Sequence, residues 1–383
     1  MGQFEVKILI TGANGFIGKN LRVELKNRGY KTLFLCDQET TVQELKEFTR
    51  QCDFVFHLAG VNRPKKIEEF MEGNAGFTEE LIALLEVTGR KIPILLTSSI
   101  QAELDNPYGI SKHMAEKTVR AYGEKQDCPV YLYRLSNVFG KWCRPNYNSV
   151  VATFCHNIAR EMPISIHNPE TRLELVYIDD VVEEFIGCME KAVLTQKEPE
   201  PAKEIWSEHG VPVWYSITLQ ELADKLRFFH ESRKTLEVPD MSDELEKKLY
   251  STYLSYLPED GFSYPLRMNI DERGSFTEIL RTKDRGQVSV NIAKPGITKG
   301  NHWHHTKNEK FLVVKGEALI QFRKVGTEEI IEYRVSAEKL EVVDIPTGYT
   351  HNIINVGTDD LVTVMWANEA FDQEKPDTWY EKV

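Results

Sequence analysis

Cysteine is scarce in this sequence of 383 residues, and long apolar runs are absent. The six cysteines form no CxxC pair, so we predict free, mostly buried thiols in a reducing cytosol instead of disulfides or a thiolate metal site. No stretch approaches the ~18 apolar residues of a membrane-spanning helix. The N-terminal residues also lack the basic flank and cleavage site of a secretory signal, so we expect a cytoplasmic protein without membrane insertion.

Positive charge is also in short supply. The 47 lysines and arginines are outnumbered by 59 aspartates and glutamates, which gives a formal net charge of −12. Because an acidic protein repels a phosphate backbone, we exclude nucleic acid as the main partner. Hydrophobic residues make up 41% and aromatic residues 10% of the chain, which is enough apolar surface for a packed core and excludes general disorder.

Strand-like and helix-like segments alternate through residues 4–190. Short apolar runs between amphipathic segments are typical of βαβ units, so we predict a Rossmann-like, doubly wound α/β domain with a parallel sheet. Residues 195–212, rich in Glu and Pro, are predicted to form a surface loop. The expected strands are 4–10, 31–36, 53–58, 92–96 and 130–134, and the expected helices are 15–28, 74–87, 108–126, 219–231 and 242–250.

The pattern changes near Leu257. Helical periodicity nearly disappears, and short apolar runs recur between glycine or polar clusters, which favours a small all-β sandwich or barrel. We therefore predict two domains, 1–256 and 257–383. The expected strands of the second domain are 288–292, 310–314, 318–322, 330–335, 341–345 and 361–366.

A glycine motif follows the first expected strand and opens the first helix. Gly12 permits a tight turn, Gly15 lets the backbone approach a pyrophosphate, and Gly18 allows close packing of the helix on the strand. Because the motif lies between a strand and a helix, it predicts a dinucleotide site. The residues expected to contact the cofactor are Gly12, Asn14, Gly15, Phe16, Ile17 and Gly18.

Asp37 ends the second expected strand. An acidic residue there commonly binds the adenosine ribose, which favours NAD(H) over NADP(H); the alternative is an ordinary exposed turn aspartate.

Tyr108 and Lys112 are four residues apart, so their side chains share one face of the expected helix. A neighbouring ammonium stabilises a phenolate, so we expect Lys112 to lower the pKa of Tyr108. Ser98 and Ser99 end the fourth strand, at the edge where such sheets bind ligands.

These motifs resemble the extended short-chain dehydrogenase/reductase family. Further matches are His57-Leu58-Ala59-Gly60, Asn74, Arg134 with Asn137–Gly140, and Tyr177 with Asp179–Asp180. The resemblance implies that Tyr108 is the catalytic acid/base, that Ser99 binds the reacting oxygen, and that Lys112 orients the nicotinamide ribose. Ser98 stays a candidate for the serine role because the spacing between Ser99 and Tyr108 is short for the family. Leu58, Ala59, Gly60, Asn74 and Lys112 are the further residues expected to contact the cofactor.

Histidines gather in the last third of the chain. Strand alternation puts His302 and His304 on one face, and with Glu309 and His351 they form an N₃O set suited to Zn²⁺, Mn²⁺ or Fe²⁺. The two motifs resemble the cupin family, although Leu340 replaces the leading glycine of the second. The resemblance implies an all-β jelly roll, these four residues as metal ligands, and zinc as the favoured metal, in either a catalytic or a structural role.

The order of the two domains is informative, because the chain as a whole resembles the bifunctional enzymes of capsular polysaccharide biosynthesis. The most similar stretches are 141–150 and 294–316. The resemblance implies a UDP-2-acetamido-2,6-dideoxy-4-ketohexose substrate, which the cupin domain would epimerise at C3 and the reductase domain would reduce at C4. The product would be UDP-2-acetamido-2,6-dideoxy-L-talose, a precursor of UDP-N-acetyl-L-fucosamine.

Several roles stay open within this scheme. The coenzyme is NADP(H) by resemblance, whereas Asp37 favours NAD(H). His305, Lys299 and Tyr349 are candidates for the epimerisation acid and base, beside ligand positions. The alternatives are an NAD-dependent nucleotide-sugar epimerase with a structural, dimerising cupin, and a non-catalytic sugar-nucleotide sensor. We expect a homodimer, since cupins often pair. Expected substrate contacts are Arg134, Asn137, Arg144 and Asn146.

Overall fold

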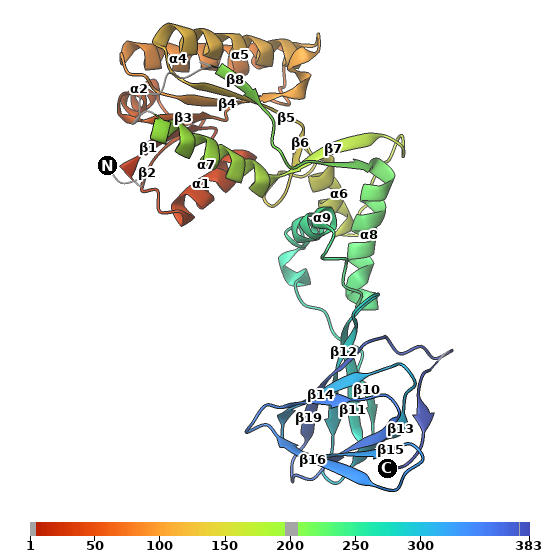
Figure 1. Ribbon diagram of the computed structural model, residues 1–383. Coiled ribbons are helices and arrows are strands. Elements are labelled where there is room, and N and C mark those ends of the chain that lie inside the picture. The colour runs from red at the N-terminus through yellow and green to blue at the C-terminus, as the bar shows by residue number, and fades with distance from the viewer. Residues whose placement is uncertain (1–4, 196–205, 375) are drawn as a thin grey trace. The chain divides into compact units, whose positions relative to one another are not determined.

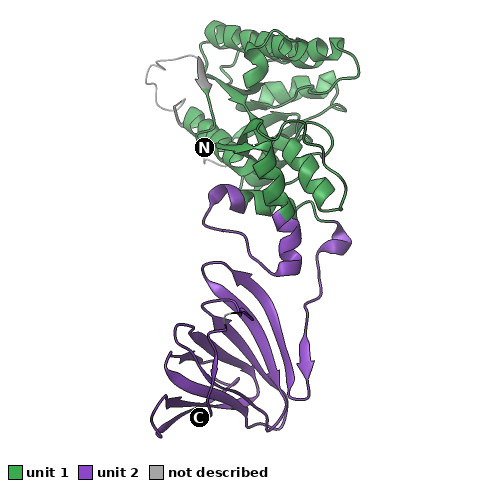
Figure 2. Cartoon of the chain, turned by 90° about the vertical axis from the view of Figure 1, so that its right-hand side faces the viewer, with its two compact units in different colours: residues 1–227, 248–257 green, residues 228–247, 258–383 purple. Residues whose placement is uncertain are grey.

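The computed structural model describes residues 5–195, 206–374 and 376–383 (Figure 1). It divides into two compact units, Met1–Arg227 with Lys248–Leu257, and Phe228–Lys247 with Pro258–Val383 (Figure 2). Residues 228–247 therefore group with the second unit although they precede the expected boundary at 256. That boundary remains a prediction about which segments fold independently.

The main sheet of the first unit has six strands in the order β2-β1-β3-β4-β5-β8, and every neighbouring pair is parallel. The chain moves from β1 to β2 on one side and then to β3 on the other. Ligands bind at such a reversal, beyond the carboxyl ends of the strands. The bounds are β1 Lys7–Thr11, β2 Thr32–Cys36, β3 Phe54–His57, β4 Ile94–Ser99, β5 Val130–Leu135 and β8 Trp206–His209.

Helices cover both faces of this sheet (Figure 1). Ile8 and Ile10 of β1 pack in the core beneath α1 and α7, whereas Leu9 packs in the core beneath α2, α4 and α5. The strands are apolar on both faces for this reason, so the expected doubly wound α/β fold is confirmed. The bounds are α1 Phe16–Asn27, α2 Val42–Gln51, α4 Phe77–Val87, α5 Pro107–Gln126 and α7 Ile178–Thr195.

The predicted surface loop 195–212 is wrong in part. Residues 206–209 form β8, which pairs in parallel with β5 and extends the sheet. The pairing partner lies far away in the chain, so local composition did not reveal it. Residues 196–205 of the same prediction lie outside the described residues.

Smaller elements complete the first unit and lead into the second. Strands β6, β7 and β9 form a separate three-stranded sheet. Their bounds and those of the remaining helices are β6 Asn137–Phe139, β7 Arg172–Tyr177, β9 Tyr215–Thr218, α3 Glu68–Phe70, the π-helical η2 Met71–Gly76, η3 Ile100–Glu103, α6 Val150–Ile158, α8 Leu219–Thr235, α9 Glu244–Leu254 and η4 Glu259–Gly261.

The second unit contains two antiparallel sheets, ordered β10-β11-β12-β19-β14-β17 and β16-β15-β18-β13-β20. Side chains from both, such as Phe311 of β14 and Ile353 of β18, form its core. The expected all-β domain is confirmed, and β13 Thr298–Trp303 contains the strand expected at His302. The sequence pattern missed four strands: β10 Asn269–Asp271, β11 Gly274–Thr282, β18 Tyr349–Asn355 and β20 Trp379–Tyr380. The expected strands appear as β12 Gly286–Ala293, β14 Glu309–Lys315, β15 Glu317–Lys324, β16 Ile330–Ser336, β17 Val342–Ile345 and β19 Leu361–Ala367.

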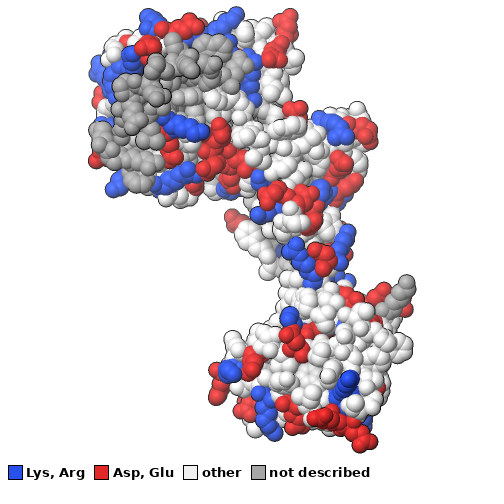
Figure 3. Space-filling view, in the orientation of Figure 1, with Lys and Arg blue, Asp and Glu red and all other residues white. Residues whose placement is uncertain are grey.

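The surface and the thiols agree with the composition. Acidic and basic side chains intermingle on the face drawn in Figure 3, so that face carries no broad basic patch. All six cysteines are free, and only Cys143 is not fully buried. Within the described part of the chain, no helix combines the length and the apolar character needed to cross a bilayer.

Candidate active site and metal centre

The turn between β1 and α1 has the backbone that the glycine motif predicted. Gly12 has a φ of +67°, and a Cβ there would lie 2.8 Å from the backbone nitrogen of Ala59. A Cβ at Gly18 would lie 2.3 Å from the carbonyl oxygen of Gly12. No side chain caps the first turn of α1, where Phe16 and Ile17 lie, so its amide donors remain for an anion. The turn therefore has the geometry of a pyrophosphate site.

Asp37 lies beside this turn, directly after β2. The side-chain amide of Asn14 donates a hydrogen bond to the Asp37 carboxylate. Arg22 Nη1 of α1 in turn donates to Asn14 Oδ1 at 3.3 Å. A carboxylate suited to binding a ribose and a guanidinium suited to binding a phosphate therefore both lie beside this turn. Sequence reasoning missed Arg22 because it looked for a cation only immediately after Asp37.

The loop after β3 is held by Asn74. Its Oδ1 accepts from the Val61 amide at 2.8 Å, and its Nδ2 donates to the Val61 carbonyl and to Ser111 Oγ. The Ala59 amide donates to Thr11 Oγ1 at 3.2 Å, which ties the same loop to β1. Asn74 lies in the π-helical turn η2, a distortion often found at functional sites. In this structure its amide holds the loop 58–61 against the sheet edge.

His57 is a buried structural histidine. Its Nδ1 and Nε2 lie 2.7 Å and 2.8 Å from the hydroxyls of Thr11 and Thr78, which links β1, β3 and α4. Burial lowers the pKa of His57 to about 3, so the ring is neutral at physiological pH.

Tyr108 and Ser99 meet at the carboxyl edge of β4. Helix α5 starts immediately before Tyr108, where Asn106 accepts from the Gly109 amide at 2.8 Å. A Cβ at Gly109 would lie 2.3 Å from the Gln101 carbonyl oxygen, so glycine permits the close approach of α5 to η3. Burial raises the pKa of the Tyr108 phenol, and the neighbouring Ser99 hydroxyl opposes this rise. The expected lowering of this pKa is therefore wrong, because burial outweighs the neighbouring groups.

Lys112 lies one turn further along α5 and is buried. Its Nζ donates to the Thr97 carbonyl at 2.8 Å, and a Cβ added at Gly60 would lie 3.5 Å from it. Burial lowers the pKa of Lys112 to about 8, and the negative charge of Glu116 opposes this shift. Lys112 thus bridges α5, the end of β4 and the loop after β3, which is where a cofactor would reach the sheet edge.

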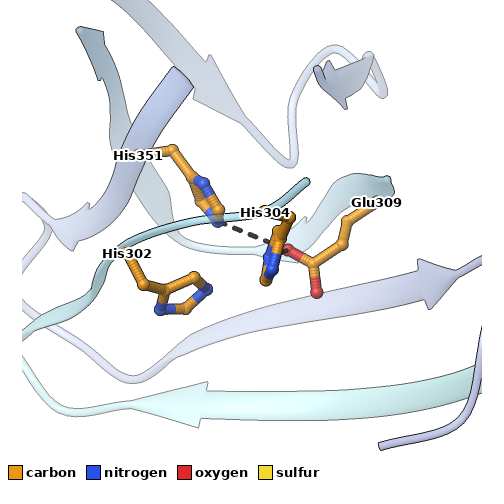
Figure 4. A group of neighbouring side chains, drawn as sticks. All are labelled: His302, His304, Glu309 and His351. Carbon is orange, nitrogen blue, oxygen red and sulfur yellow. Dashed lines mark ion pairs between the residues drawn. The ribbon is translucent and has the colours of Figure 1, made fainter. Parts of the chain in front are cut away.

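Four side chains converge in the second unit, as the histidine pattern predicted (Figure 4). One ligand atom from each of them lies within 4.8 Å of the others: His302, His304, Glu309 and His351. Glu309 Oε2 lies 3.4 Å from His304 Nε2 and 3.3 Å from His351 Nε2. These three atoms are buried without a hydrogen-bond partner among the described residues.

The chemistry of this set fits a divalent cation. Burial lowers the pKa of His302 to about 4, so its ring is neutral and able to coordinate. Burial opposes ionisation of Glu309, yet the neighbouring rings of His304 and His351 lower its pKa below the usual range. His304 Nδ1 contacts the backbone carbonyl of Asp377, the kind of outer contact that orients a histidine ligand. Three imidazoles and one carboxylate, with converging orphan atoms, are a suitable site for zinc.

Comparisons with known proteins give matches for both parts of the chain. Residues 8–199 match the model of the NAD dependent epimerase/dehydratase family. The chain belongs to this family. Residues 269–379 match the polysaccharide biosynthesis C-terminal domain.

Members with both parts of the chain are among its relatives. A UDP-2-acetamido-2,6-beta-L-arabino-hexul-4-ose reductase of Pseudomonas aeruginosa is 50% identical over 98% of each chain. The crystal structure of CapF from Staphylococcus aureus, a capsular polysaccharide assembling protein, superposes with a TM-score of 0.90 at 50% identity, over 99% of this chain and 100% of that one. A mouse dTDP-D-glucose 4,6-dehydratase is 25% identical over 70% of this chain and 82% of its own. The expected resemblance to CapF-type fused enzymes is confirmed, and with it the expectation of an enzyme.

The four residues expected to contact the substrate make different interactions within the protein. Arg134 is engaged by two carboxylates, Glu116 and Glu103, so its guanidinium holds the end of β5. Asn137 donates to a backbone carbonyl of β7, and Arg144 lies over the Tyr147 ring. Asn146 has a left-handed φ of +53°.

The three candidates for epimerisation also differ. The Lys299 ammonium donates to Asn291 Oδ1 and the Ile292 carbonyl, both at 2.8 Å, in the neighbouring sheet. His305 is exposed and packs edge-on against the Trp303 ring. Tyr349 is two residues before His351 on β18, so it shares the inward face with this ligand. Tyr349 is therefore the candidate that strand geometry brings nearest to the cluster.

Two further residues beside the cluster escaped sequence reasoning. The Asp377 carboxylate accepts backbone amides of His305, Thr306 and Lys307, and so holds the loop that follows His304. The Lys307 ammonium is nearly buried, 4.0 Å from Glu309 Oε1. Both line a pocket of about 250 Å³. Lys307 lies inside the histidine motif itself, which was the available signal, whereas Asp377 is too distant in sequence to be found from spacing.

Proposed function

We propose that the chain is a bifunctional UDP-sugar enzyme of polysaccharide biosynthesis. The second unit epimerises C3 of a UDP-2-acetamido-2,6-dideoxy-4-ketohexose, and the first unit reduces the C4 ketone with NAD(P)H to UDP-2-acetamido-2,6-dideoxy-L-talose, on the route to UDP-N-acetyl-L-fucosamine. The observation that carries the proposal is the placement of Ser99 at the end of β4 with Tyr108 and Lys112 on the adjoining α5, together with the N₃O cluster, in one chain. The 50% identical relative, named as a reductase of such a sugar, supports it.

In the reductase site, Tyr108 gives its phenolic proton to the C4 oxygen, while Ser99 donates a hydrogen bond to the same oxygen. The nicotinamide supplies the hydride when bound. Lys112 binds the nicotinamide ribose and, as a cation, stabilises the phenolate that Tyr108 becomes after the transfer. We keep Ser99 ahead of Ser98 for this role, because the Ser99 hydroxyl opposes the rise in the pKa of Tyr108, whereas Ser98 is buried.

For the coenzyme we favour NADPH, although Asp37 alone favours NADH. Arg22 supports this choice, because its guanidinium reaches Asn14 and so lies near the corner where a 2′-phosphate would bind. Replacing Arg22 by alanine should raise KM for NADPH by about tenfold or more, and should leave KM for NADH nearly unchanged. An equal change in both values would remove Arg22 from the coenzyme site.

In the second unit, His302, His304, Glu309 and His351 hold the metal, which we expect to be zinc. A metal held there would act as a Lewis acid on the C4 carbonyl beside the acidic C3 proton. One side chain takes that proton and another returns a proton to the opposite face. Tyr349 is the first candidate for one of these roles, because it shares the inward strand face with His351. His305 and Lys299 remain the other candidates.

The test follows both reactions in one tube. The zinc-loaded chain receives the 4-keto-6-deoxy UDP-HexNAc in deuterium oxide with NADPH, with NADH or with neither, and NMR follows the products. We expect deuterium at C3 without coenzyme and reduction at C4 only after coenzyme is added. Absence of C3 exchange would leave the second unit as a structural or dimerising module. Absence of reduction with exchange retained would refute the reductase, and absence of both reactions would favour a sugar-nucleotide sensor.

We also propose a homodimer, on the resemblance of the second unit to cupins. Light scattering should give twice the mass of the chain, and the chain mass alone would refute this part.

A further inference from the structure

A buried carboxylate lies behind the reductase site. The side chain of Glu116 is 1% exposed and accepts two hydrogen bonds from Arg134, at 2.9 Å and 2.7 Å. Arg120 Nη2 lies 3.6 Å from the same carboxylate, and His113 Nδ1 lies at 4.0 Å. Burial disfavours the charge of Glu116, yet the hydrogen bonds of Arg134 outweigh it and lower the pKa of Glu116. The carboxylate is therefore ionised inside the fold.

Glu116 belongs to the helical row that carries the reductase side chains. Tyr108, Lys112 and Glu116 follow one another at intervals of four residues on α5, so they share one face of the helix. On the sheet, Arg134 of β5 pairs in register with Ser98 of β4, the residue directly before Ser99. The Glu116–Arg134 pair thus joins α5 to the strand ends that present the serine.

Lys112 needs such a carboxylate because its ammonium is buried. Its nearest acceptor is the neutral carbonyl of Thr97, and the titratable group that faces it from β3 is His57, which is uncharged. On its own helix Lys112 faces the neutral Tyr108 phenol and the Glu116 carboxylate. Glu116 therefore supplies the negative charge that opposes loss of the Lys112 proton.

We propose that Glu116 is a positioning residue of the reductase: anchored by Arg134, it keeps Lys112 charged and keeps α5 in place on the strand end at Ser99. This inference rests on the proposed roles of Tyr108 and Lys112. It also assigns Arg134 a structural role, anchoring Glu116, in place of the expected contact with the substrate.

The expected consequence is a change in the pH profile. Lys112 loses its proton as the pH rises, so the reductase kcat of the wild type should fall as the pH passes about 8. Removing the negative charge at Glu116 disfavours the ammonium, so the same fall should begin at a lower pH. An opposite charge at this range shifts a pKa by about one unit or more, which sets the expected displacement.

The experiment measures kcat against pH for the full chain by coenzyme oxidation, in E116Q, E116D and the control E124Q, a glutamate exposed on the same helix. E116Q should lose about twofold or more in kcat at neutral pH and should shift the alkaline fall to lower pH. E116D keeps the charge and should keep the wild-type pH profile despite a lower kcat. A folded E116Q with the profile and kcat of E124Q would overturn the proposal.

A second variant covers the case in which E116Q does not fold. The double variant E116Q/R134Q also removes the Arg134 cation that pairs with Glu116, so it should fold more readily than E116Q, and its kcat should be lowered as in E116Q. A double variant with wild-type kcat would overturn the proposal. Y108F separates the two levels of inference: an active Y108F refutes Tyr108 as the proton donor, whereas an inactive Y108F with a normal Glu116 series refutes only the role of Glu116.

Discussion

The two candidate sites differ in how far their buried polar atoms find partners: among the described residues, the Ser98 hydroxyl lacks one at the first site, and three side chains have atoms that lack one at the second. In the first unit, His57 binds two threonine hydroxyls, Asn74 binds a backbone loop, and Lys112 donates to a carbonyl. In the second unit, nitrogen atoms of His304 and His351 are buried with no hydrogen-bond partner among the described residues, and so is one oxygen of Glu309. Buried polar atoms without partners cost stability, so the difference has a physical meaning.

The comparison indicates which site depends on a ligand for its own integrity. The side chains of the reductase site are held mainly by hydrogen bonds within the protein. Binding and release of soluble molecules should therefore leave their arrangement unchanged. A cation bound as proposed would satisfy the orphan atoms of the histidine cluster, so metal binding and the stability of the second unit should be coupled. The predictions below separate the two sites on this basis.

The largest expected effect is the loss of reduction in Y108F. Removing the proton donor should lower kcat for coenzyme oxidation by about 10²–10⁴-fold, while metal content stays at the wild-type level. The measurements are steady-state kinetics and elemental analysis of the same sample. A loss of metal in Y108F would show that the two sites are not independent.

The second effect is confined to the metal centre. H351A should lose most of its zinc and, with it, the stabilisation that bound metal gives, about 2.7 kcal/mol at a metal concentration one hundred times Kd. Elemental analysis and thermal unfolding with and without a chelator check this, and H167A, which removes an exposed histidine, is the control. Equal zinc content in H351A and H167A would contradict the ligand assignment.

A third effect belongs to the first unit and depends on pH. The His57 ring has a folded-state pKa of about 3, below its ordinary value near 6.5, so the unfolded chain binds a proton that the folded chain does not. Stability from this residue is complete above pH ~6.5 and falls as the pH drops toward 3, by up to about 1.4 kcal/mol per pH unit.

Urea unfolding of wild type and H57Q between pH 7 and pH 5 measures this slope. The wild type should lose stability more steeply than H57Q, and added zinc should not change the difference. Equal slopes would mean that His57 is not held neutral by burial.

The smallest expected effect is a change in stability from a substitution that is remote from both sites. Thr41 begins α2 with a capping box, in which its hydroxyl accepts from the Glu44 amide and the Glu44 carboxylate accepts from the Thr41 amide. T41A should cost about 1 kcal/mol in urea unfolding and should leave kcat and zinc content unchanged. A change in either activity or metal would show that the first unit transmits strain from α2 to a site.

Local patterns in the sequence were sufficient for much of this picture. The turn at Gly12, the Tyr108–Lys112 pair and the cluster of His302 and His304 depend on spacings of a few residues, which strand and helix geometry convert directly into position. The missed features depend on partners distant in the chain. Glu116 of α5 meets Arg134 of β5 only because the helix packs on the sheet. Asp377 contacts His304 although the two are 73 residues apart in the sequence. Burial, which outweighs the neighbours of Tyr108, is likewise a property of the packed fold.

The most direct test of two separate sites is exchange in a chain whose reductase is disabled. Full-length Y108F, loaded with zinc and without any coenzyme, is incubated with the 4-keto-6-deoxy UDP-HexNAc in deuterium oxide, and NMR follows the C3 position. The account predicts that deuterium enters C3 at the wild-type rate while no reduction occurs when NADPH is added. Loss of C3 exchange in Y108F would contradict it, because the epimerisation would then depend on the reductase site.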